Sequence, residues 1–388
     1  MTAAFFLIVA AIPFIYYLIA IYSSWRYFHQ PTNPPDPGYT PPISNLKPVR
    51  GLDPDAYENF SSFCRQDYPD YEIVFCVDPD DQAVLSVIDR VRADFPECEI
   101  RVLYGSQRVA ANDKVAKLTR LVNEARHEIV VISDSDVRVR PDYLRSITAP
   151  LRNPKIGAVT CFYAPAGIKT FTDHLQTAGM ISDFYAGVLV AWQLDGIKFA
   201  LGTTIATTRS HLAKFGGYAS IENQPADDLL VGRLIAEQGF EVALLNYVVE
   251  TVPDYASFRA LIHKRLRWLV VMRHMRPSGH LGLLLTQGLP WSIAAVVIHP
   301  SAAIALGYFA TYIFLRALIT WIIGIHGLKQ PRTWLQMPLI PLWDAVAFVI
   351  WLASFLRKSI RWRGADYYIR AGKLVPVLNS AALNSAKD

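Results

Sequence analysis

Apolar residues divide the chain into a short apolar beginning, a mixed middle and a long apolar end. Residues 3–22 form an apolar run of about the length that a helix needs to cross a bilayer. Further apolar segments occupy 281–298, 302–325 and 334–356. The stretch between them has ordinary globular composition and is long enough for one substantial domain. The pattern therefore predicts a folded domain framed by membrane segments.

The mixed middle alternates strand-like and helix-like patterns. Strand-like runs lie at 43–49, 72–77, 99–104, 129–132, 156–161, 199–207 and 240–245. Helix-like runs lie at 57–66, 82–95, 112–126, 141–148, 170–191 and 227–238. Repeated β-α units of this kind predict an α/β fold with a mostly parallel, doubly wound sheet.

The strand-like run 129–132 ends abruptly in Ser133-Asp134-Ser135-Asp136. A short, continuous apolar run suits a strand buried on both faces of a parallel sheet, and ligands of open α/β sheets sit outside the carboxyl ends of such strands. Hard divalent cations are commonly held there by one or two carboxylates together with substrate phosphates. The Asp-x-Asp is a candidate metal and diphosphate site, with an ordinary polar turn as the alternative.

Other charged residues also fall at predicted strand or helix ends. Asp78, Asp80 and Asp81 follow the strand 72–77, where a carboxylate can accept hydrogen bonds from uracil or ribose; a solvated turn is the alternative. Lys114 begins the helix 112–126, where a helix N-terminus and a cation favour a diphosphate.

Asp227 and Asp228 open the helix 227–238. Acidic side chains at a helix N-terminus serve as caps and as partners of the helix dipole. One of the two is expected to cap the helix while its neighbour faces the cleft. A carboxylate in the cleft, within hydrogen-bond reach of a hydroxyl, is able to act as a general base.

A basic amphipathic helix is predicted at 255–275, and its tryptophan suits the membrane interface. Within it, Lys264-Arg265-Leu266-Arg267-Trp268 offers cations for phosphate oxygens and a flat ring for a sugar. Contact with lipid headgroups alone is the competing interpretation.

Charge and cysteine content limit the partners and the cellular compartment that are expected for the chain. The 388 residues carry a net charge of only +5, which gives no case for nucleic acid as a partner. Basic residues instead gather beside the apolar segments, as at a membrane surface. Arg26, Lys47 and Arg50 follow the first apolar run and place the middle domain in the cytoplasm. None of the four cysteines forms a CxxC pair, so no zinc site or disulfide framework is expected.

The order of these motifs resembles the ceramide glucosyltransferase family, glycosyltransferase family 21. Its members are membrane-bound enzymes with the GT-A fold, and their pattern is written D, D, D, (Q/R)xxRW. The similarity runs from Leu46-Lys47-Pro48-Val49-Arg50-Gly51 to beyond Trp268. Trp362-Arg363-Gly364 and Tyr367-Tyr368 are similar to the tails of bacterial relatives, and the chain looks closest to hopanoid-biosynthesis glycosyltransferases.

The resemblance implies an inverting transferase that moves a sugar from a UDP-sugar to a membrane lipid. It maps uridine binding to Asp80 and Asp81 with Asp78 close by, Mn²⁺ or Mg²⁺ binding to Asp134 and Asp136, and the catalytic base to Asp228. The remaining donor contacts map to Lys114, Asp134, Lys264, Arg267 and Trp268.

Two positions depart from the family pattern. Lys264 stands where Gln or Arg is expected. Lysine keeps the positive charge of arginine but lacks its planar, forked guanidinium group. Ser182-Asp183-Phe184-Tyr185 replaces a histidine-containing segment of the ceramide enzymes, which weakens ceramide itself as the acceptor. The acceptor is therefore ceramide or a hopanoid polyol, and the sugar is glucose or N-acetylglucosamine.

The resemblance and the apolar pattern together predict a GT-A catalytic domain, Rossmann-like with a mostly parallel sheet, between N-terminal and C-terminal transmembrane helices in a bacterial inner membrane. The expected parts are an anchor at 1–25, a proline-rich linker at 26–42, the GT-A domain at 43–252, an interfacial helix at 253–280, membrane segments at 281–356 and a basic cytoplasmic tail at 357–388. The segment 281–298 is short and contains Pro290, so it is expected to lie in the interface or re-enter, which brings the tail inside.

Two other classes of protein remain open on the sequence. A processive polysaccharide synthase shares the chemistry but usually needs more membrane spans. A non-catalytic membrane scaffold or transport protein with a nucleotide-binding fold should have lost the acidic positions, and all of them are present.

Overall fold

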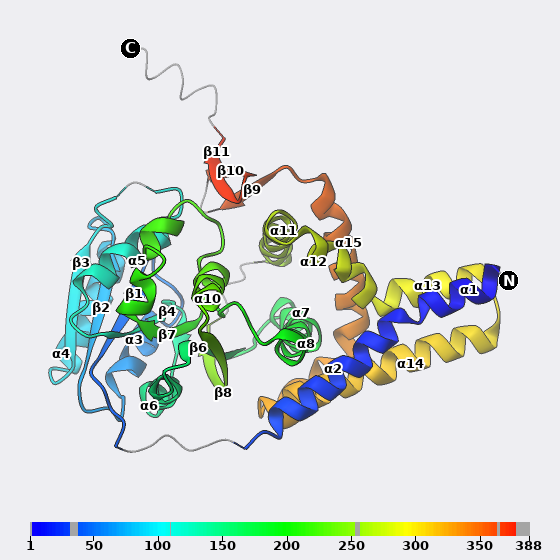
Figure 1. Ribbon diagram of the computed structural model, residues 1–388, viewed down its shortest axis with the longest axis horizontal. Coiled ribbons are helices and arrows are strands. Elements are labelled where there is room, and N and C mark those ends of the chain that lie inside the picture. The colour runs from blue at the N-terminus through cyan, green and yellow to red at the C-terminus, as the bar shows by residue number, and fades with distance from the viewer. Residues whose placement is uncertain (1, 32–37, 109, 253–256, 363–364, 378–388) are drawn as a thin grey trace, which may run out of the picture.

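A mixed eight-stranded sheet forms the centre of the computed structural model, which describes residues 2–31, 38–108, 110–252, 257–362 and 365–377 (Figure 1). Its order is β3-β2-β1-β4-β7-β6-β8-β5. The strands are β1 (Ile43–Pro48), β2 (Tyr71–Val77), β3 (Glu99–Tyr104), β4 (Ile129–Ser133), β5 (Val137–Arg138), β6 (Ile156–Pro165), β7 (Thr204–Thr208) and β8 (Glu241–Thr251).

Most strand pairs in this sheet are parallel. β1 pairs in parallel with β2 and β4, β2 with β3, and β6 with β8. β7 runs antiparallel between β4 and β6, and the short β5 runs antiparallel to β8. Every residue of β4 is buried, as its continuous apolar run predicts. The α/β fold class with a mostly parallel sheet, expected from the sequence, is confirmed.

Helices cover both faces of the sheet and create two apolar cores. α3 (Ala56–Cys64), α4 (Gln82–Asp94) and α6 (Tyr143–Thr148) pack on one face. α5 (Asp113–Glu124), α9 (Arg209–Ala213) and α10 (Asp227–Glu237) pack on the other. Parallel strands need crossover helices, and coverage on both faces explains why these strands are apolar throughout.

The helix predicted at 170–191 is interrupted. α7 (Phe171–Gly179) and α8 (Tyr185–Asp195) are joined by a π-helical turn, Met180–Phe184. The strand predicted from residue 199 begins only at Thr204, because the chain first passes through a tight connection around Gly202. β8 continues six residues past its predicted end, to Thr251.

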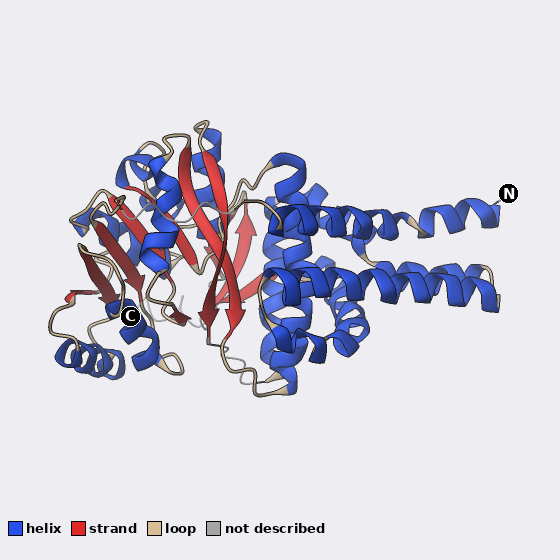
Figure 2. Ribbon diagram, turned by 90° about the horizontal axis from the view of Figure 1, so that it is seen from below, coloured by secondary structure: helices blue, strands red, loops and turns tan. Residues whose placement is uncertain are grey.

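Long apolar helices project from the sheet domain, and the N-terminus lies at the far tip of one of them (Figure 2). Within the part of the chain that the structure describes, three helices are long and apolar enough to cross a membrane: Ala4–Phe28, Ala302–Gly327 and Met337–Leu356. A fourth segment is a pair of shorter pieces, Pro277–Thr286 and Gly288–Ile298, bent by 57°.

The projecting helices are packed on one another. α1 (Thr2–Ala10) and α2 (Ile12–Phe28) form the first, and α13 (Gly288–Ile298) and α14 (Ala302–Thr320) follow the bend as a hairpin beside them (Figure 1). α15 (Ile340–Leu356) instead runs across these helices and packs mainly along α7 and α11 (Phe258–Met275).

A buried ion pair fixes α15 to α14 and to the sheet domain. Arg316 Nε donates to Asp344 Oδ2 at 3.0 Å, and Tyr312 donates to the same oxygen at 2.7 Å. Arg316 also bonds the carbonyl and the hydroxyl of Ser182 in the π-helical turn. The segment that departs from the family pattern is thus a structural junction here.

The chain ends, in its described part, in a small antiparallel sheet. Its strands are β9 (Ser359–Trp362), β10 (Ala365–Arg370) and β11 (Lys373–Pro376), in the order β11-β10-β9. The sequence predicted only a basic tail in this region. The sheet lies next to α11 and close to the loops at one edge of the large sheet (Figure 1).

Candidate functional site

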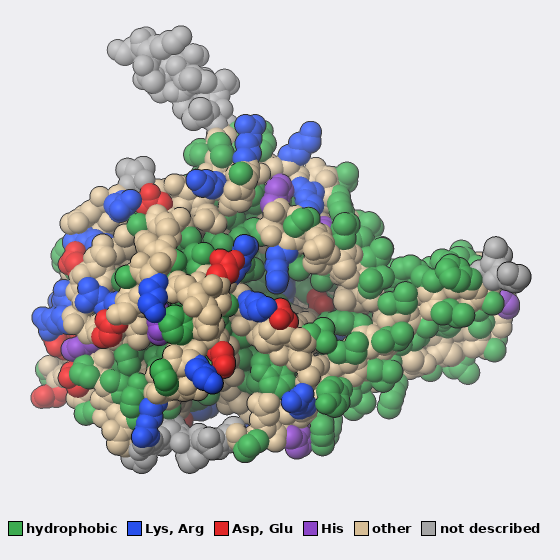
Figure 3. Space-filling view, in the orientation of Figure 1, with side chains coloured by type: hydrophobic (Ala, Val, Ile, Leu, Met, Phe, Trp, Pro, Cys, Tyr) green, Lys and Arg blue, Asp and Glu red, His purple; other side chains and the backbone are tan. Residues whose placement is uncertain are grey.

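Acidic and basic side chains from three elements meet at the carboxyl ends of the parallel strands. Lys114 Nζ, in the first turn of α5, lies 2.7 Å from Asp134 Oδ1 just after β4. The same nitrogen lies 3.4 Å from Asp227 Oδ2 at the start of α10. One lysine thereby joins the Asp-x-Asp to the second acidic pair. Figure 3 shows cations and carboxylates around a hollow between the sheet domain and the helices.

The carboxylates after β4 are crowded. Partial burial raises the pKa of Asp136 to about 7, and the charges of Asp134 and Asp53 add to the effect, while Lys264 acts in the opposite direction. Ser135 donates its hydroxyl hydrogen bond to Asp53, and Val252 N donates to Asp136 O at 2.9 Å. The backbone is thus held so that Asp136 stays close to its acidic neighbours.

The donor set fits a hard divalent cation shared with a ligand. Asp134 and Asp136 supply carboxylate oxygens, the ligands that Mg²⁺ and Mn²⁺ prefer. Among the described residues, no group of three or more His, Cys, Asp or Glu side chains is placed to hold a metal ion. A cation here needs further oxygen ligands from a diphosphate or from water, which is how Mg²⁺ is usually held in phosphate-transfer sites.

Two buried lysines that sequence reasoning missed lie beneath this cluster. Lys47 Nζ donates to Ser133 Oγ at 2.9 Å and to Asp134 O at 3.2 Å, and it stands 3.4 Å from the centre of the Phe63 ring. Burial lowers the pKa of Lys47 to about 7. Because its side chain is in the core, Lys47 contributes nothing to the surface charge that was expected to orient the membrane segments.

Lys117 is also buried, and its ammonium group bonds at the carboxyl end of the neighbouring strand β2. Its Nζ donates to Val49 O at 2.8 Å and to Asp78 Oδ2 at 2.9 Å, and lies 3.3 Å from Asp113 Oδ2. The lysine therefore ties the ends of β1 and β2 to α5. The signal in the sequence was its position one turn after Asp113, on the face of the helix that carries buried Val115 and Leu118.

The three acidic residues after β2 have different surroundings. Asp78 pairs with Lys117, as described. Asp81 caps α4 by accepting from Val84 N at 3.3 Å and also accepts from Gly51 N at 2.8 Å. The side chain of Asp80 is exposed. Of the three, Asp78 is the one that an ion pair connects to α5.

Asp227 and Asp228 begin α10, but neither caps it. The N-cap residue is Ala226, without a side-chain hydrogen bond, so the expectation that one aspartate caps the helix is wrong. Lys114 attracts Asp227 away from the free N–H groups. Asp228 Oδ1 accepts from Leu229 N at 2.8 Å, and partial burial, followed by the charge of Asp227, raises the pKa of Asp228 to about 6.

Gly202 allows Asp228 to occupy this place. A Cβ atom at residue 202 would lie 2.8 Å from Asp228 Oδ2, closer than Cβ atoms approach other heavy atoms in proteins. The backbone of the connection before β7 therefore forms one wall around the carboxylate. A carboxylate with a pKa near 6 is well suited to general-base chemistry near neutral pH.

The cationic motif on α11 splits into two directions. Lys264 is close enough to Asp136 to influence its pKa. Arg265 instead donates to Gln176 Oε1 at 3.2 Å and lies 4.9 Å from the ring centre of Trp343, toward the apolar helices. The centre of the Trp268 ring lies 5.5 Å from Lys264 Nζ and 5.0 Å from Cζ of the Arg265 guanidinium. Arg267 is half-buried on the same helix.

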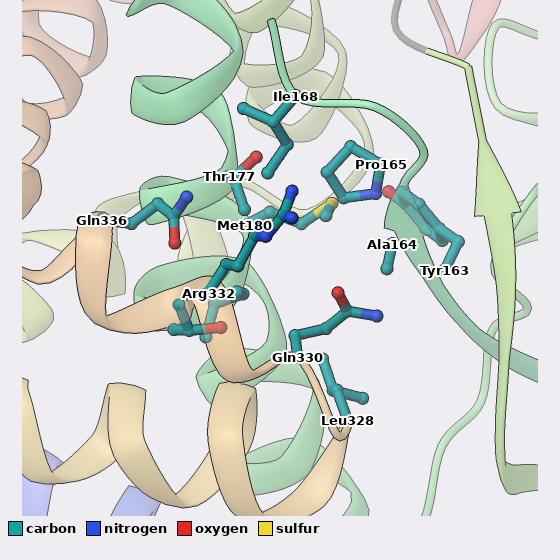
Figure 4. A pocket seen from close by; sticks show the side chains of 12 residues that line it. Tyr163, Ala164, Pro165, Ile168, Thr177, Met180, Leu328, Gln330, Arg332 and Gln336 are labelled. Carbon is teal, nitrogen blue, oxygen red and sulfur yellow. The ribbon is translucent and has the colours of Figure 1, made fainter.

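A small cavity lies elsewhere, between the end of β6, the π-helical turn and the connection from α14 to α15 (Figure 4). Its volume is about 20 Å³, room for one water molecule. Thr177, Met180 and Arg332 are among its lining residues, and none of the predicted site residues lines it. The cavity is too small for a sugar and does not compete with the acid cluster as the candidate site.

Comparisons with a family model and with known protein sequences agree on one family. The family described as Glycosyl transferase family 21 matches residues 5–375. Ceramide glucosyltransferase 3 of Caenorhabditis elegans is 21% identical over 386 residues, which cover 94% of this chain and 80% of that protein. Ceramide glucosyltransferase 1 of the same organism is 23% identical over 272 residues, covering 70% and 58%.

A solved structure shares the fold. The mannosyltransferase of Pyrobaculum calidifontis, in complex with GDP-mannose and Mn²⁺, superposes with a TM-score of 0.57 at 22% identity. The match covers 91% of this chain and 99% of that protein. The likeness extends beyond the sheet domain to most of the chain.

Proposed function

The chain belongs to glycosyl transferase family 21, and we propose that it transfers glucose or N-acetylglucosamine from a UDP-sugar to a hydroxyl group of a membrane lipid. The observation that carries this proposal is the double contact of Lys114 with Asp134 and Asp227. That contact joins a carboxylate pair suited to a metal–diphosphate with a second pair suited to proton transfer.

In the proposed reaction the acceptor oxygen bonds to the anomeric carbon as the bond from that carbon to the diphosphate oxygen breaks. Asp228 takes the hydroxyl proton, and the single base fits one displacement with inversion. Asp134 and Asp136 would hold Mn²⁺ or Mg²⁺, which when bound supplies Lewis-acid stabilisation of the leaving diphosphate.

The other candidate residues bind and orient the donor. Lys114 and Lys264 supply positive charge, with Arg267 beyond them, and preorganised charge of this kind favours the state in which the diphosphate leaves. Trp268 offers a flat ring for a sugar or for the lipid interface. We assign the uridine end of the donor to Asp78, Asp80 and Asp81, at the carboxyl end of β2.

The membrane helices and the relatives support a membrane lipid as the acceptor. A ceramide is supported by the ceramide glucosyltransferases that the chain resembles. A hopanoid polyol is supported by the tail motif and by the absence of a histidine in Ser182-Asp183-Phe184-Tyr185. Both are amphipathic alcohols that reach the enzyme from the bilayer.

Mass spectrometry of the products tests the function. The purified chain is incubated with Mn²⁺, with UDP-glucose or UDP-N-acetylglucosamine, and with ceramide or a hopanoid polyol. We expect one hexose or N-acetylhexosamine on the lipid. Formation of a long sugar polymer would favour a processive synthase, and no transfer from any donor to any lipid would contradict the proposal.

We also propose that the membrane is crossed three times, and here the proposal departs from the expectation for the segment 281–298. α13 and α14 are the two crossings after the sheet domain, and α15, instead of 281–298, lies in the interface. Trp291 of α13 contacts Phe6, so α13 runs along α1 toward the N-terminal end of the first helix. α14 returns beside α2, and His326, in the π-helical turn that follows α14, stacks on Trp25 near the C-terminal end of α2. With α15 lying across these helices, the catalytic domain and the tail are both on the cytoplasmic side.

Cysteine labelling checks this arrangement. In intact cells, with the native cysteines replaced, His299→Cys between α13 and α14 should react with an impermeant thiol reagent. Lys373→Cys in β11 should react only after the membrane is opened. Protection of His299→Cys would indicate a re-entrant loop, and labelling of Lys373→Cys from outside would make α15 a further crossing.

The lysine that departs from the family motif gives a second prediction. Lys264→Ala should raise the KM for the UDP-sugar about tenfold, because a charge-assisted contact is lost, whereas Lys264→Arg should stay within about threefold. His263→Ala, an exposed neighbour on α11, is the matched control. An unchanged donor KM in Lys264→Ala would remove this residue from the donor site.

A further inference from the structure

The C-terminal sheet is packed against the candidate site. Its buried face meets the apolar side of α11 at Val270 and Val271. The same apolar cluster includes Ala226, which directly precedes the Asp227–Asp228 pair, and Ala111, which precedes α5. The buried residues contributed by the sheet are Ile360, Ile369 and Leu374.

A chain of hydrogen bonds runs from this sheet into the loop before α10. Leu374 N in β11 donates to Asn223 O at 2.7 Å. The side chain of Asn223 in turn accepts from Ala111 N at 3.1 Å, through Oδ1. Asn223 is therefore the point where the C-terminal sheet, the loop before α5 and the loop before α10 meet.

The same two loops are joined a second time, closer to the site. Asn112 Nδ2 donates to Gln224 O at 3.0 Å, and Asn112 N donates to Glu222 O at 3.1 Å. Asn112 also caps α5 by accepting from Val115 N. Lys114 follows two residues later, in the first turn that this cap fixes.

We propose that the C-terminal sheet is a positioning element for sugar transfer, acting through Asn223 on the loops that lead into the first turns of α5 and α10, where Lys114 and Asp228 lie. The inference rests on the proposed function. Neither Leu374 nor Asn223 is among the residues assigned to substrate. Their effect is geometric: they set the spacing between the base and the cation that faces the diphosphate. Misplacement of a reacting group by about 1 Å lowers rates by roughly a hundredfold.

Variants of Asn223 test the link, because this side chain is exposed and its replacement should not unfold the protein. In the full-length enzyme, with UDP-glucose and ceramide in mixed micelles, Asn223→Ala should lower kcat about tenfold or more. Asn223→Asp keeps an oxygen acceptor for Ala111 N and should restore most of kcat. Binding of UDP with Mn²⁺, measured by calorimetry, should change less than about twofold in both.

The two faces of β11 provide a matched pair. Leu374→Ala removes the buried side chain and should reproduce the loss of kcat, while Val375→Ala on the exposed face should not. Equal losses in the two variants, or a normal kcat in Asn223→Ala and Leu374→Ala, would overturn the inference. So would an Asn223→Ala defect that Asn223→Asp does not rescue.

The controls separate this inference from the proposed function. If wild-type enzyme transfers only N-acetylglucosamine, or only to a hopanoid polyol, those substrates replace UDP-glucose and ceramide in the same assays. A wild-type chain without any transfer counts against the proposed function. An active wild-type chain whose kcat is insensitive to Asn223→Ala counts against the positioning role alone.

Discussion

Replacement of Asp136 by alanine should abolish sugar transfer, lowering kcat about a thousandfold or more and removing the response to Mn²⁺. The reason is geometric: Asp136 and Asp134 flank a single residue at the end of β4, and a cation shared with the diphosphate needs both carboxylates. Activity titrated against Mn²⁺ after chelation measures the effect.

The fold should survive this change. Asp136 lies in a crowded acidic cluster with Asp134 and Asp53, so removing one carboxylate relieves repulsion and should leave the thermal unfolding midpoint unchanged or higher. Asp89→Ala is the control, since Asp89 is an exposed carboxylate on α4 that forms a surface ion pair with Arg92. Near-normal turnover of Asp136→Ala with an unaltered Mn²⁺ response would remove the metal assignment.

Sequence reasoning located the acidic residues because strand ends are strong signals. Asp134 follows a continuous apolar run, and the carboxyl ends of parallel strands share one edge of the sheet. The structure does bring Asp134 and Asp227 together there, through Lys114. Nothing local in the sequence states which cation faces which carboxylate, because that depends on where the folded chain places the start of α5 relative to the ends of β4 and α10.

The buried lysines were missed for a related reason. Lys47 and Lys117 sit in otherwise regular strand and helix patterns, where a lysine normally indicates a solvated position. Only the tertiary structure reveals that both faces around them are covered and that backbone carbonyls accept from their ammonium groups. The prediction that one aspartate caps α10 failed for the same reason. Asp227 pairs with Lys114, which is distant in the sequence, instead of accepting from the N–H groups at the start of its own helix.

The C-terminal sheet escaped detection because its turn is atypical. Ala371 and Gly372 have φ angles of 48° and 75°, the left-handed pair that a two-residue hairpin turn requires. Asn or Asp is usual at the first of these positions, so alanine there hides the signal. The strands are also short, and charged residues alternate with the few apolar ones that pack on α11.

Asp228→Asn should lower kcat about a thousandfold while the affinity for UDP with Mn²⁺ changes less than about twofold. The amide is nearly isosteric and still accepts from Leu229 N, but it cannot take the proton of the acceptor hydroxyl. Steady-state kinetics and calorimetry on the same preparation give the two quantities. A collapse of UDP affinity would instead assign Asp228 to the donor site.

The pH dependence of kcat makes the role of Asp228 more specific. With a pKa raised to about 6, Asp228 becomes protonated and inactive as the pH falls through that value, so wild-type kcat should decline on the acid side of pH 6. The negative charge of Asp227 is one cause of the raised pKa. Asp227→Asn removes that charge, favours ionised Asp228 and should therefore move the acid limb to lower pH, whatever it does to the maximal rate. An acid limb that stays in place in Asp227→Asn would show that a group other than Asp228 controls the rate.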